Sequence, residues 1–225
     1  MFLRNGLNNF NISDIDKTRS QDITNSENIE DSDILFLCVK PKDMKDVLPL
    51  FTNFENKTIV SCASGIKLSE LEKYSDSCVR IMPNLPIQYG KGAISYFTKT
   101  VLPEQIRVLC RGPKLLRCGE EKMLDISTIT NGSAPAFISY FAKEYVQFAT
   151  SRGLTMSEAM TAYISTLEGT AELLKHFSPD DIISKVSSPN GVTSKAITHL
   201  NNSDVRENIR ESLEVSLNHL TKLKH

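Results

Sequence analysis

Three short apolar runs constrain the fold of this chain more than any other feature of its sequence. They cover Ile34–Val39, Thr58–Ala63 and Cys78–Met82, and helical patterns at Met44–Phe51 and Leu68–Tyr74 separate them. Continuous apolar runs of this length are typical of strands that are buried on both faces. The alternation of strands and helices therefore predicts an α/β domain built on a doubly wound parallel sheet.

A strand-stopping or turn-forming segment follows each run: Lys40-Pro41, Ser64-Gly65 and Pro83-Asn84. In doubly wound sheets ligands bind beyond the carboxyl ends of the strands, so these segments are candidate ligand-binding loops. A purely structural explanation also fits them. Proline commonly ends a strand, and the two prolines on either side of Asn84 can form a rigid turn.

The second half of the chain has a different pattern. A further strand, helix and strand are expected to complete the sheet domain, at Ala93–Phe97, Pro103–Arg111 and Leu115–Cys118. From about Lys122 onward the pattern is helical, at Ala136–Phe148, Thr155–Phe177 and Asp204–Leu223. We therefore predict two domains, residues 1–121 and 122–225. The first of these helices is apolar over a broad arc, which favours burial against a second subunit.

The overall composition excludes several classes of protein. The 225 residues carry 26 Lys and Arg against 27 Asp and Glu, which argues against nucleic-acid or membrane-surface partners. No apolar run approaches the roughly 18 residues of a membrane span, and the polar start does not resemble a signal peptide, so we expect a soluble cytoplasmic protein. Five widely spaced cysteines indicate buried thiols, and four unclustered histidines indicate no metal site.

The segment Pro179–Asn201 carries the strongest functional signal. Its centre, from Ser187 to Thr193, reads SSPNGVT and leads directly into a helical pattern. A helix start has unpaired N–H groups and the positive end of the helix dipole, so it can hold a carboxylate. Gly191 allows close approach of the backbone, and Ser188 and Thr193 supply hydroxyl groups. Taken alone, these residues favour the alternative of a well-capped helix without a ligand.

This segment resembles the C-terminal signature of the pyrroline-5-carboxylate reductase family, in which a proline, spaced hydrophobic residues and two small hydroxyl residues precede Asn/Gly-Gly-x-Thr and a helix. The matching positions are Pro179, Ile182, Val186, Ser187, Ser188, Asn190, Gly191, Thr193, Ala196, Ile197, Leu200 and Asn201. Earlier segments resemble the same family in the same order: Val39–Pro41, Ser61–Ile66, Arg80–Pro86, and Asn131–Phe137 with Ala134 in place of a glycine. The likeness covers roughly residues 20–225.

The resemblance implies a Rossmann-like parallel-sheet domain followed by a helical dimerisation domain that forms a homodimer or a larger homo-oligomer. It implies reduction of the C=N bond of 1-pyrroline-5-carboxylate to L-proline, with NADPH or NADH as the hydride donor. The residues implied to bind this imino-acid substrate are Ser188, Gly191, Val192 and Thr193, with Thr193 as the catalytic residue at the imine nitrogen. The residues implied to line the cofactor cleft are Asn25, Val39, Lys40, Pro41, Ala63, Gly65, Pro83 and Asn84.

The chain departs from the family near its start. Dinucleotide binding of this type uses a first strand, a Gly-x-Gly-x-x-Gly turn and a helix that holds the pyrophosphate, and the sequence contains no such turn. We therefore expect a truncated Rossmann-like domain whose sheet lacks its central strand. Three explanations stay open: an incomplete sequence, a relative that has lost cofactor binding, and a divergent member that binds the cofactor weakly through the remaining loops.

Two functions of different classes follow from this pattern. The first is an NAD(P)H-dependent pyrroline-5-carboxylate reductase. The second is a non-catalytic dimeric relative that keeps the imino-acid pocket for binding or regulation. A third, reduction of a different cyclic imine or of a ketone, is suggested by Ala134. The short loop after Ser13-Asp14 leaves the preference between NADPH and NADH open.

Overall fold

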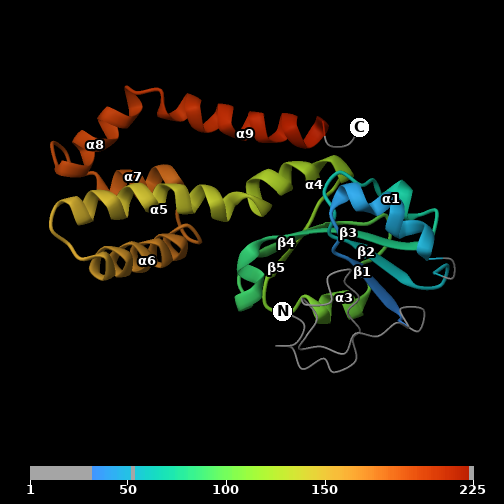
Figure 1. The fold of residues 1–225 in the computed structure, drawn as a ribbon. Coiled ribbons are helices and arrows are strands. Elements are labelled where there is room, and N and C mark those ends of the chain that lie inside the picture. The colour runs from blue at the N-terminus through green and yellow to red at the C-terminus, as the bar shows by residue number, and fades with distance from the viewer. Residues whose placement is uncertain (1–31, 52–53, 223–225) are drawn as a thin grey trace. The chain divides into compact units, whose positions relative to one another are not determined.

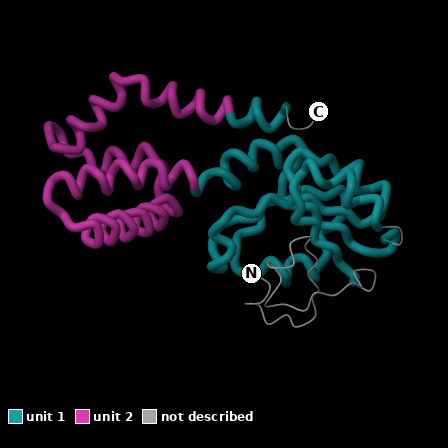
Figure 2. The backbone as a smooth tube through the Cα atoms, viewed as in Figure 1, with its two compact units in different colours: residues 1–135, 216–225 teal, residues 136–215 magenta. Residues whose placement is uncertain are grey.

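The computed structural model describes residues 32–51 and 54–222 (Figure 1). The chain divides into two compact units, residues 1–135 with 216–225 and residues 136–215 (Figure 2). The first unit contains the sheet, and the second is helical. The prediction of an α/β domain followed by an all-helical one is confirmed.

Within the described residues, five strands form one sheet in the order β1 to β5. Their bounds are Ile34–Leu37, Thr58–Ser61, Ser77–Pro83, Ala93–Phe97 and Lys114–Arg117. The first three strands are parallel, with Leu37 beside Ser61 and Ser61 beside Arg80. The three apolar runs are therefore neighbouring parallel strands, as predicted, and their carboxyl ends share one edge of the sheet.

Strand β4 differs from the expected parallel arrangement, because it runs antiparallel to β3, with Pro83 opposite Ile94. A parallel neighbour needs a crossover connection of about a dozen residues or more. The connection here is shorter and holds only the 3-10 helix η6, Leu85–Tyr89, followed by Gly90 at φ 70°. The chain therefore turns back on itself. Strand β5 is again parallel to its neighbour, because helix α3, Glu104–Leu109, crosses between β4 and β5.

The helices before α3 are shorter than the sequence patterns suggest. Helix α1 covers Met44–Val47, between the 3-10 turns η4 and η5, and α2 covers Leu68–Leu71. Pro49 lies in η5, Leu48–Leu50, and proline cannot donate the backbone hydrogen bond that would extend the α-helix. The other 3-10 turn, η4, covers Pro41–Asp43 and follows the end of β1 directly.

Hydrophobic cores lie on both faces of the sheet. Ile59 and Cys78 belong to a core on one face, together with residues of α1 and α2. Val60 and Val79, their neighbours in sequence, belong to the core on the other face, together with Ile106 of α3. Successive side chains of a strand point to opposite faces, so each strand supplies both cores. This arrangement fixes the strand ends that form the predicted ligand-binding edge.

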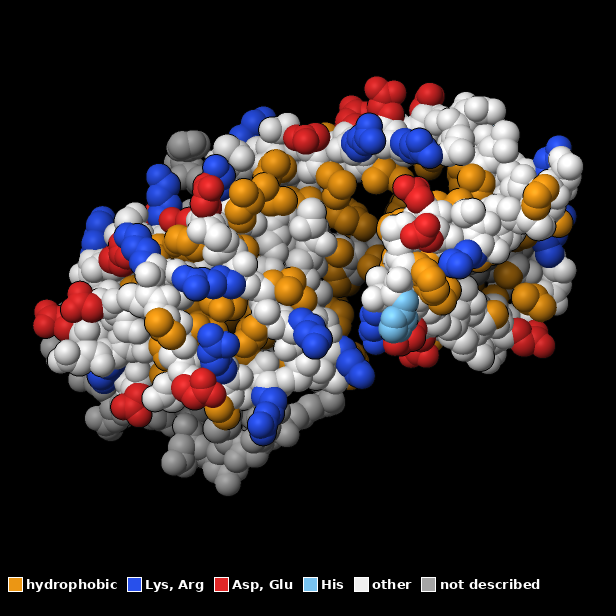
Figure 3. Space-filling view, turned by 180° about the vertical axis from the view of Figure 1, so that it is seen from behind, with side chains coloured by type: hydrophobic (Ala, Val, Ile, Leu, Met, Phe, Trp, Pro, Cys, Tyr) orange, Lys and Arg blue, Asp and Glu red, His pale blue; other side chains and the backbone are white. Residues whose placement is uncertain are grey.

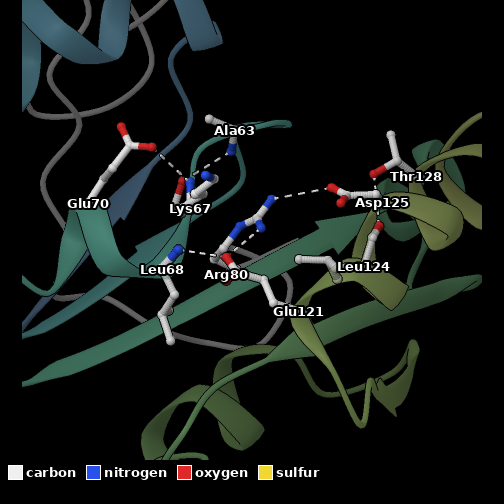
Figure 4. Close-up of polar contacts among 10 residues, drawn as sticks. Ala63, Lys67, Leu68, Glu70, Arg80, Glu121, Leu124, Asp125 and Thr128 are labelled. Atoms are coloured by element: carbon white, nitrogen blue, oxygen red, sulfur yellow. Dashed lines mark hydrogen bonds and ion pairs between the residues drawn. The ribbon is translucent and has the colours of Figure 1, made fainter. Parts of the chain in front are cut away.

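A buried arginine connects the sheet to helix α4, Glu121–Ser127. The Arg80 side chain is 3% exposed, and its Nη1 atom lies 2.7 Å from Glu121 Oε1, with Asp125 Oδ1 4.0 Å from Nη2 (Figure 4). The backbone N–H of Leu68 also donates to Glu121 Oε1, at 2.6 Å. Glu121 therefore joins β3, α2 and α4, and it supplies the nearest counter-charge to the buried Arg80.

Helix α4 and the π-helical turn η7, Thr128–Gly132, pack against β3 and β4. For this reason the compact units meet at residues 135 and 136. The change from strands to helices in the sequence instead places the predicted boundary between residues 121 and 122. The predicted boundary between residues 121 and 122 stays a prediction.

The described chain after η7 is helical, and residues 136–215 of it form the helical unit. The helices are α5 Ala134–Ser151, α6 Met156–Leu173, α7 Pro179–Val186, α8 Val192–Asn201 and α9 Val205–Lys222. Helix α5 contains the pattern predicted at 136–148, α6 ends at Leu173 and so is shorter than the pattern at 155–177, and α9 matches the pattern at 204–223 as far as the described residues extend. No helix in the described ranges combines the length and hydrophobicity needed to cross a lipid bilayer.

The helical unit buries few of its hydrophobic side chains. Among residues 136–215, which the structure describes throughout, the buried hydrophobic residues are Val146 and Ala159. In contrast, Tyr140, Tyr145 and Phe148 of α5 are each 64–67% exposed. Hydrophobic side chains are visible on the surface of this unit (Figure 3). Large exposed apolar surfaces of this kind mark interaction sites.

Candidate active site

The junction between α7 and α8 places the predicted substrate residues together. Helix α7 ends at Val186, and Ser187 to Asn190 form the loop that leads to Gly191, the residue that caps α8. Asn190 adopts a left-handed conformation, with φ 59°, which asparagine tolerates better than most residues. The N–H of Gly191 donates to the carbonyl oxygen of Ser188 at 2.9 Å, so the loop turns tightly into the helix.

The start of α8 offers free hydrogen-bond donors. The backbone N–H groups of Val192, Thr193 and Ser194 have no acceptor within the described part of the chain, and no side chain caps the helix. The first turn contains no acidic residue, and Val192 is 91% exposed. Unpaired N–H groups at the positive end of a helix dipole bind anions. This helix start can therefore hold a carboxylate.

Helix α7 shows the opposite arrangement. The N–H of Asp181 donates to Ser178 Oγ at 3.2 Å, and the Ser178 hydroxyl donates to the Asp181 carboxylate at 2.6 Å. The hydrogen bonds from Ser178 lower the pKa of Asp181. A capping box thus supplies the anion for α7 from within the chain. Helix α8 has no such residue, which distinguishes its start from an ordinary capped helix.

Gly191 is needed because of its contact with Ser188. A Cβ atom at this position would overlap Ser188 Oγ and would lie 3.0 Å from the Ser188 carbonyl oxygen. The backbone of Gly191 has φ −75°, so the constraint is space and not backbone conformation. The hydroxyls of Ser188 and Thr193 have no hydrogen-bond partner among the described residues, and Ser187 Oγ is shielded from solvent without a partner there. Hydroxyl and N–H donors therefore gather at one helix start.

The predicted cofactor residues follow the ends of the parallel strands. Val39, Lys40 and Pro41 follow β1, and Ala63 and Gly65 follow β2. The N–H of Cys62 donates to the carbonyl oxygen of Leu37 at 2.9 Å, which extends the pairing of β1 and β2 by one residue. Lys40 is exposed, and Gly65 has φ 81°, a conformation that glycine adopts without strain. The structure brings these residues to one edge of the sheet, together with Pro83 at the end of β3.

Asn84 makes internal hydrogen bonds at this edge. Its Oδ1 atom accepts from the N–H of Ala93 at 3.1 Å, and its Nδ2 atom donates to Asn131 Oδ1 at 2.9 Å. Asn131 in turn donates to the carbonyl oxygens of Met82 and Ala93, each at 3.3 Å. The Asn84 side chain thus ties β3, β4 and η7 together and sets the shape of the loop after β3. Its predicted contact with a cofactor stays a prediction.

Some predicted residues lie outside the described residues, and some features were not predicted. Asn25 belongs to residues 1–31, which are outside the described ranges. The ion pair of Arg80 with Glu121 was missed, although an arginine within an apolar strand signals a buried partner. Cys38 was expected to be buried, but it is exposed because it follows the last residue of β1.

No group of three or more His, Cys, Asp or Glu side chains is placed to hold a metal ion within the described ranges.

Comparison with known proteins gives further evidence for the family to which this chain belongs. A family model described as pyrroline-5-carboxylate reductase dimerisation matches residues 121–223, and a model described as NADP oxidoreductase, coenzyme F420-dependent, matches residues 10–65. The pyrroline-5-carboxylate reductase of Aquifex aeolicus is 30% identical over 194 residues, which are 82% of this chain and 72% of that protein.

Solved structures agree with this result. A pyrroline-5-carboxylate reductase from Coxiella burnetii has a TM-score of 0.75 and 26% identity, and the match covers 87% of this chain and 77% of that one. The pyrroline carboxylate reductase of Plasmodium falciparum, solved with NADP bound, has a TM-score of 0.75 and 20% identity, over 86% of this chain and 78% of that one. At that identity the second likeness concerns the fold.

Proposed function

Because the chain belongs to the pyrroline-5-carboxylate reductase family, we propose that it reduces the C=N bond of 1-pyrroline-5-carboxylate to give L-proline, as a step of proline biosynthesis. The observation that carries the proposal is the start of α8. Its N–H groups and neighbouring hydroxyls lack partners in the described chain, and a cyclic imino acid has a carboxylate and a ring nitrogen that need such partners.

We propose specific roles for the residues at this helix start. The N–H groups of Val192 and Thr193 and the Ser188 hydroxyl bind the substrate carboxylate. Gly191 leaves the space that Ser188 occupies above the helix end. The Thr193 hydroxyl donates to, or accepts from, the imine nitrogen, depending on whether that nitrogen is protonated. A protonated imine accepts hydride more readily, so a hydroxyl that holds the proton at this nitrogen favours the reaction.

We propose that a reduced nicotinamide cofactor, NADPH or NADH, supplies the hydride. Val39, Lys40, Pro41, Ala63, Gly65, Pro83 and Asn84 are the residues that would line its cleft, and Asn25 is proposed to lie near its adenosine ribose. The exposed Lys40 fits a phosphate, and the left-handed Gly65 lets the backbone approach a ligand closely. The NADP bound in the Plasmodium falciparum relative supports this cofactor class.

We also propose that the protein is a cytoplasmic homodimer or a larger homo-oligomer held together by its helical domain, which we place at residues 122–225. The small number of buried hydrophobic residues in the helical unit supports this arrangement, as does the dimerisation model that matches there. The free cysteines fit a reducing compartment. Light scattering of the purified protein is expected to give at least twice the mass of one chain. A monomer at micromolar concentration would contradict the proposal.

The proposed reaction is tested by following NADPH and NADH oxidation with 1-pyrroline-5-carboxylate, together with calorimetric binding of each cofactor. Turnover that produces proline is the expected result. The alternative function, a non-catalytic dimer that keeps the imino-acid pocket, predicts binding of a pyrroline or proline carboxylate without cofactor binding or turnover. Absence of both ligand binding and turnover would rule out both functions for this chain.

Replacement of Gly191 by alanine is expected to raise the KM for the imino acid more than about tenfold, which corresponds to about 1.4 kcal/mol of lost binding. The new Cβ atom must displace Ser188, whose carbonyl oxygen lies only 3.0 Å away. Steady-state kinetics at saturating cofactor measure the effect. Gly119→Ala is the matched control, because a Cβ atom there has no neighbour within 4 Å. Equal KM values for the two variants would show that the α8 start does not bind the substrate.

A further inference from the structure

Two cysteine side chains lie next to each other at the carboxyl ends of β1 and β2. Cys38 follows Leu37 and Cys62 follows Ser61, and these two strand residues are direct neighbours in the parallel pairing. The sulfur atoms of Cys38 and Cys62 are 3.7 Å apart. The hydrogen bond from Cys62 N–H to the Leu37 carbonyl oxygen, at 2.9 Å, holds the two strand ends together at this position. The contact is therefore built into the sheet.

The spacing of neighbouring strands suits a covalent link between these residues. Adjacent strands lie about 4.8 Å apart, and a disulfide forms between residues whose Cα atoms are about 4.4–6.8 Å apart. Rotation of the two side chains can therefore bring the sulfur atoms from 3.7 Å to bonding distance without moving the strands. Because Cys38 is exposed, a reductant can reach a link of this kind and reduce it again.

The two thiols differ in exposure and in pKa, which gives each a separate role in disulfide formation. Cys38 is exposed, and its hydrogen bond with Cys62 lowers its pKa to about 7, which favours the reactive thiolate form. The same hydrogen bond and burial raise the pKa of Cys62, so this thiol stays protonated. Burial also raises the pKa values of Cys78 and Cys110 to about 11. Cys38 is thus the expected nucleophile, and Cys62 is the nearest thiol that can react with its product.

We propose that Cys38 and Cys62 form a reversible redox-sensitive disulfide, with a peroxide as the oxidant. The Cys38 thiolate attacks one oxygen of hydrogen peroxide, the O–O bond breaks, and hydroxide leaves to give a sulfenic acid. The Cys62 sulfur then attacks the sulfenic sulfur, the S–O bond breaks, and the hydroxyl group leaves as water with the Cys62 proton. The two thiols lose two electrons in total, and the peroxide gains them.

The cysteine pair lies beside residues that we propose to bind the cofactor. Cys38 lies two residues before Lys40, and Cys62 directly precedes Ala63, both at the edge where we propose that the cofactor binds. A disulfide would join the two loops of that edge covalently. The formation of the bond itself is independent of the proposed reductase activity, so the two proposals can fail separately.

The test is peptide mapping of the full chain after treatment with stoichiometric hydrogen peroxide and alkylation of the remaining thiols. Trypsin is expected to release residues 20–42 linked to residues 58–67, since the bond after Lys40 precedes proline and resists cleavage. Two of the five thiols are expected to become resistant to alkylation, and dithiothreitol is expected to restore them. Before oxidation, Cys38 is expected to react with iodoacetamide more than about tenfold faster than Cys78 or Cys110.

Two variants test which cysteines form the disulfide. Cys62→Ser is expected to abolish the linked peptide and to let a sulfenic-acid reagent trap Cys38, while Cys110→Ser, the matched control, is expected to leave the link unchanged. The proposal is overturned if peroxide leaves all five thiols free. It is also overturned if Cys38 of the wild-type protein is oxidised to sulfinic acid and the linked peptide does not form. A link between two chains, detected as a dimer on a non-reducing gel, would overturn it as well.

Discussion

Replacement of Glu121 by alanine is expected to lower the free energy of unfolding by about 3 kcal/mol, because it leaves the guanidinium of Arg80 buried without its nearest counter-charge. Arg80 is 3% exposed, and the remaining carboxylate of Asp125 lies 4.0 Å away, compared with 2.7 Å for Glu121. The substitution also removes the acceptor of the Leu68 N–H. Urea unfolding followed by circular dichroism, at one fixed protein concentration, measures the change.

Two further variants separate the buried charge from other effects. Arg80→Met in the Glu121→Ala background removes the buried charge and is expected to recover part of the lost stability, since apolar replacements of buried ion pairs are often nearly neutral. Glu120→Ala removes the neighbouring glutamate, which pairs with Lys122 at 2.7 Å on the exposed surface. Exposed pairs contribute about 0–1 kcal/mol, so this control is expected to have little effect. Equal losses for Glu120→Ala and Glu121→Ala would refute the assigned role of Glu121.

The sequence was sufficient to locate the strands of the sheet but not to give the direction of each. The runs at 34–39, 58–63 and 78–82 are short and mostly apolar, with Arg80 as the one charged residue, and such runs are typical of strands covered on both faces. The direction of β4 depends on the length of the connection from β3, and η6 fills that connection without crossing the sheet. The pairing of Arg80 with Glu121 joins residues 41 positions apart, which no local pattern reveals.

The candidate site was predictable to a similar extent. The residues from Ser187 to Thr193 signal a nearby helix start, and the structure begins α8 at Val192 with Gly191 as its cap, two residues before Ser194, where the helical pattern of the sequence begins. The sequence also shows that the first turn of α8 contains no acidic residue, whereas in α7 Asp181 supplies the anion. The contact between Cys38 and Cys62 required the register of β1 and β2, because 24 residues separate the two thiols in the sequence. The sequence thus predicted the local features of the site, but it did not predict contacts between residues that lie far apart in the chain.

Replacement of Thr193 by valine is expected to lower kcat for reduction of 1-pyrroline-5-carboxylate by about 10- to 100-fold, the equivalent of a lost hydrogen bond to a charged group of about 1.5–3 kcal/mol. Valine keeps the shape of threonine and removes only the hydroxyl that we propose to contact the imine nitrogen. The backbone N–H of residue 193 stays in place, so binding of the carboxylate and KM are expected to change less than kcat. Steady-state kinetics at saturating cofactor separate the two constants.

The same helix supplies a matched control for this substitution. The hydroxyl of Thr198 donates to the carbonyl oxygen of Ser194 at 2.9 Å, so Thr198→Val removes a hydroxyl that already has a partner within α8. This variant is expected to retain nearly full kcat, and Thr193→Ser, which restores a hydroxyl, is expected to recover most of the lost rate. If Thr193→Val and Thr198→Val have the same kcat, the imine contact is not made by Thr193. The proton at the ring nitrogen would then have to be held by water or by another donor near the helix start.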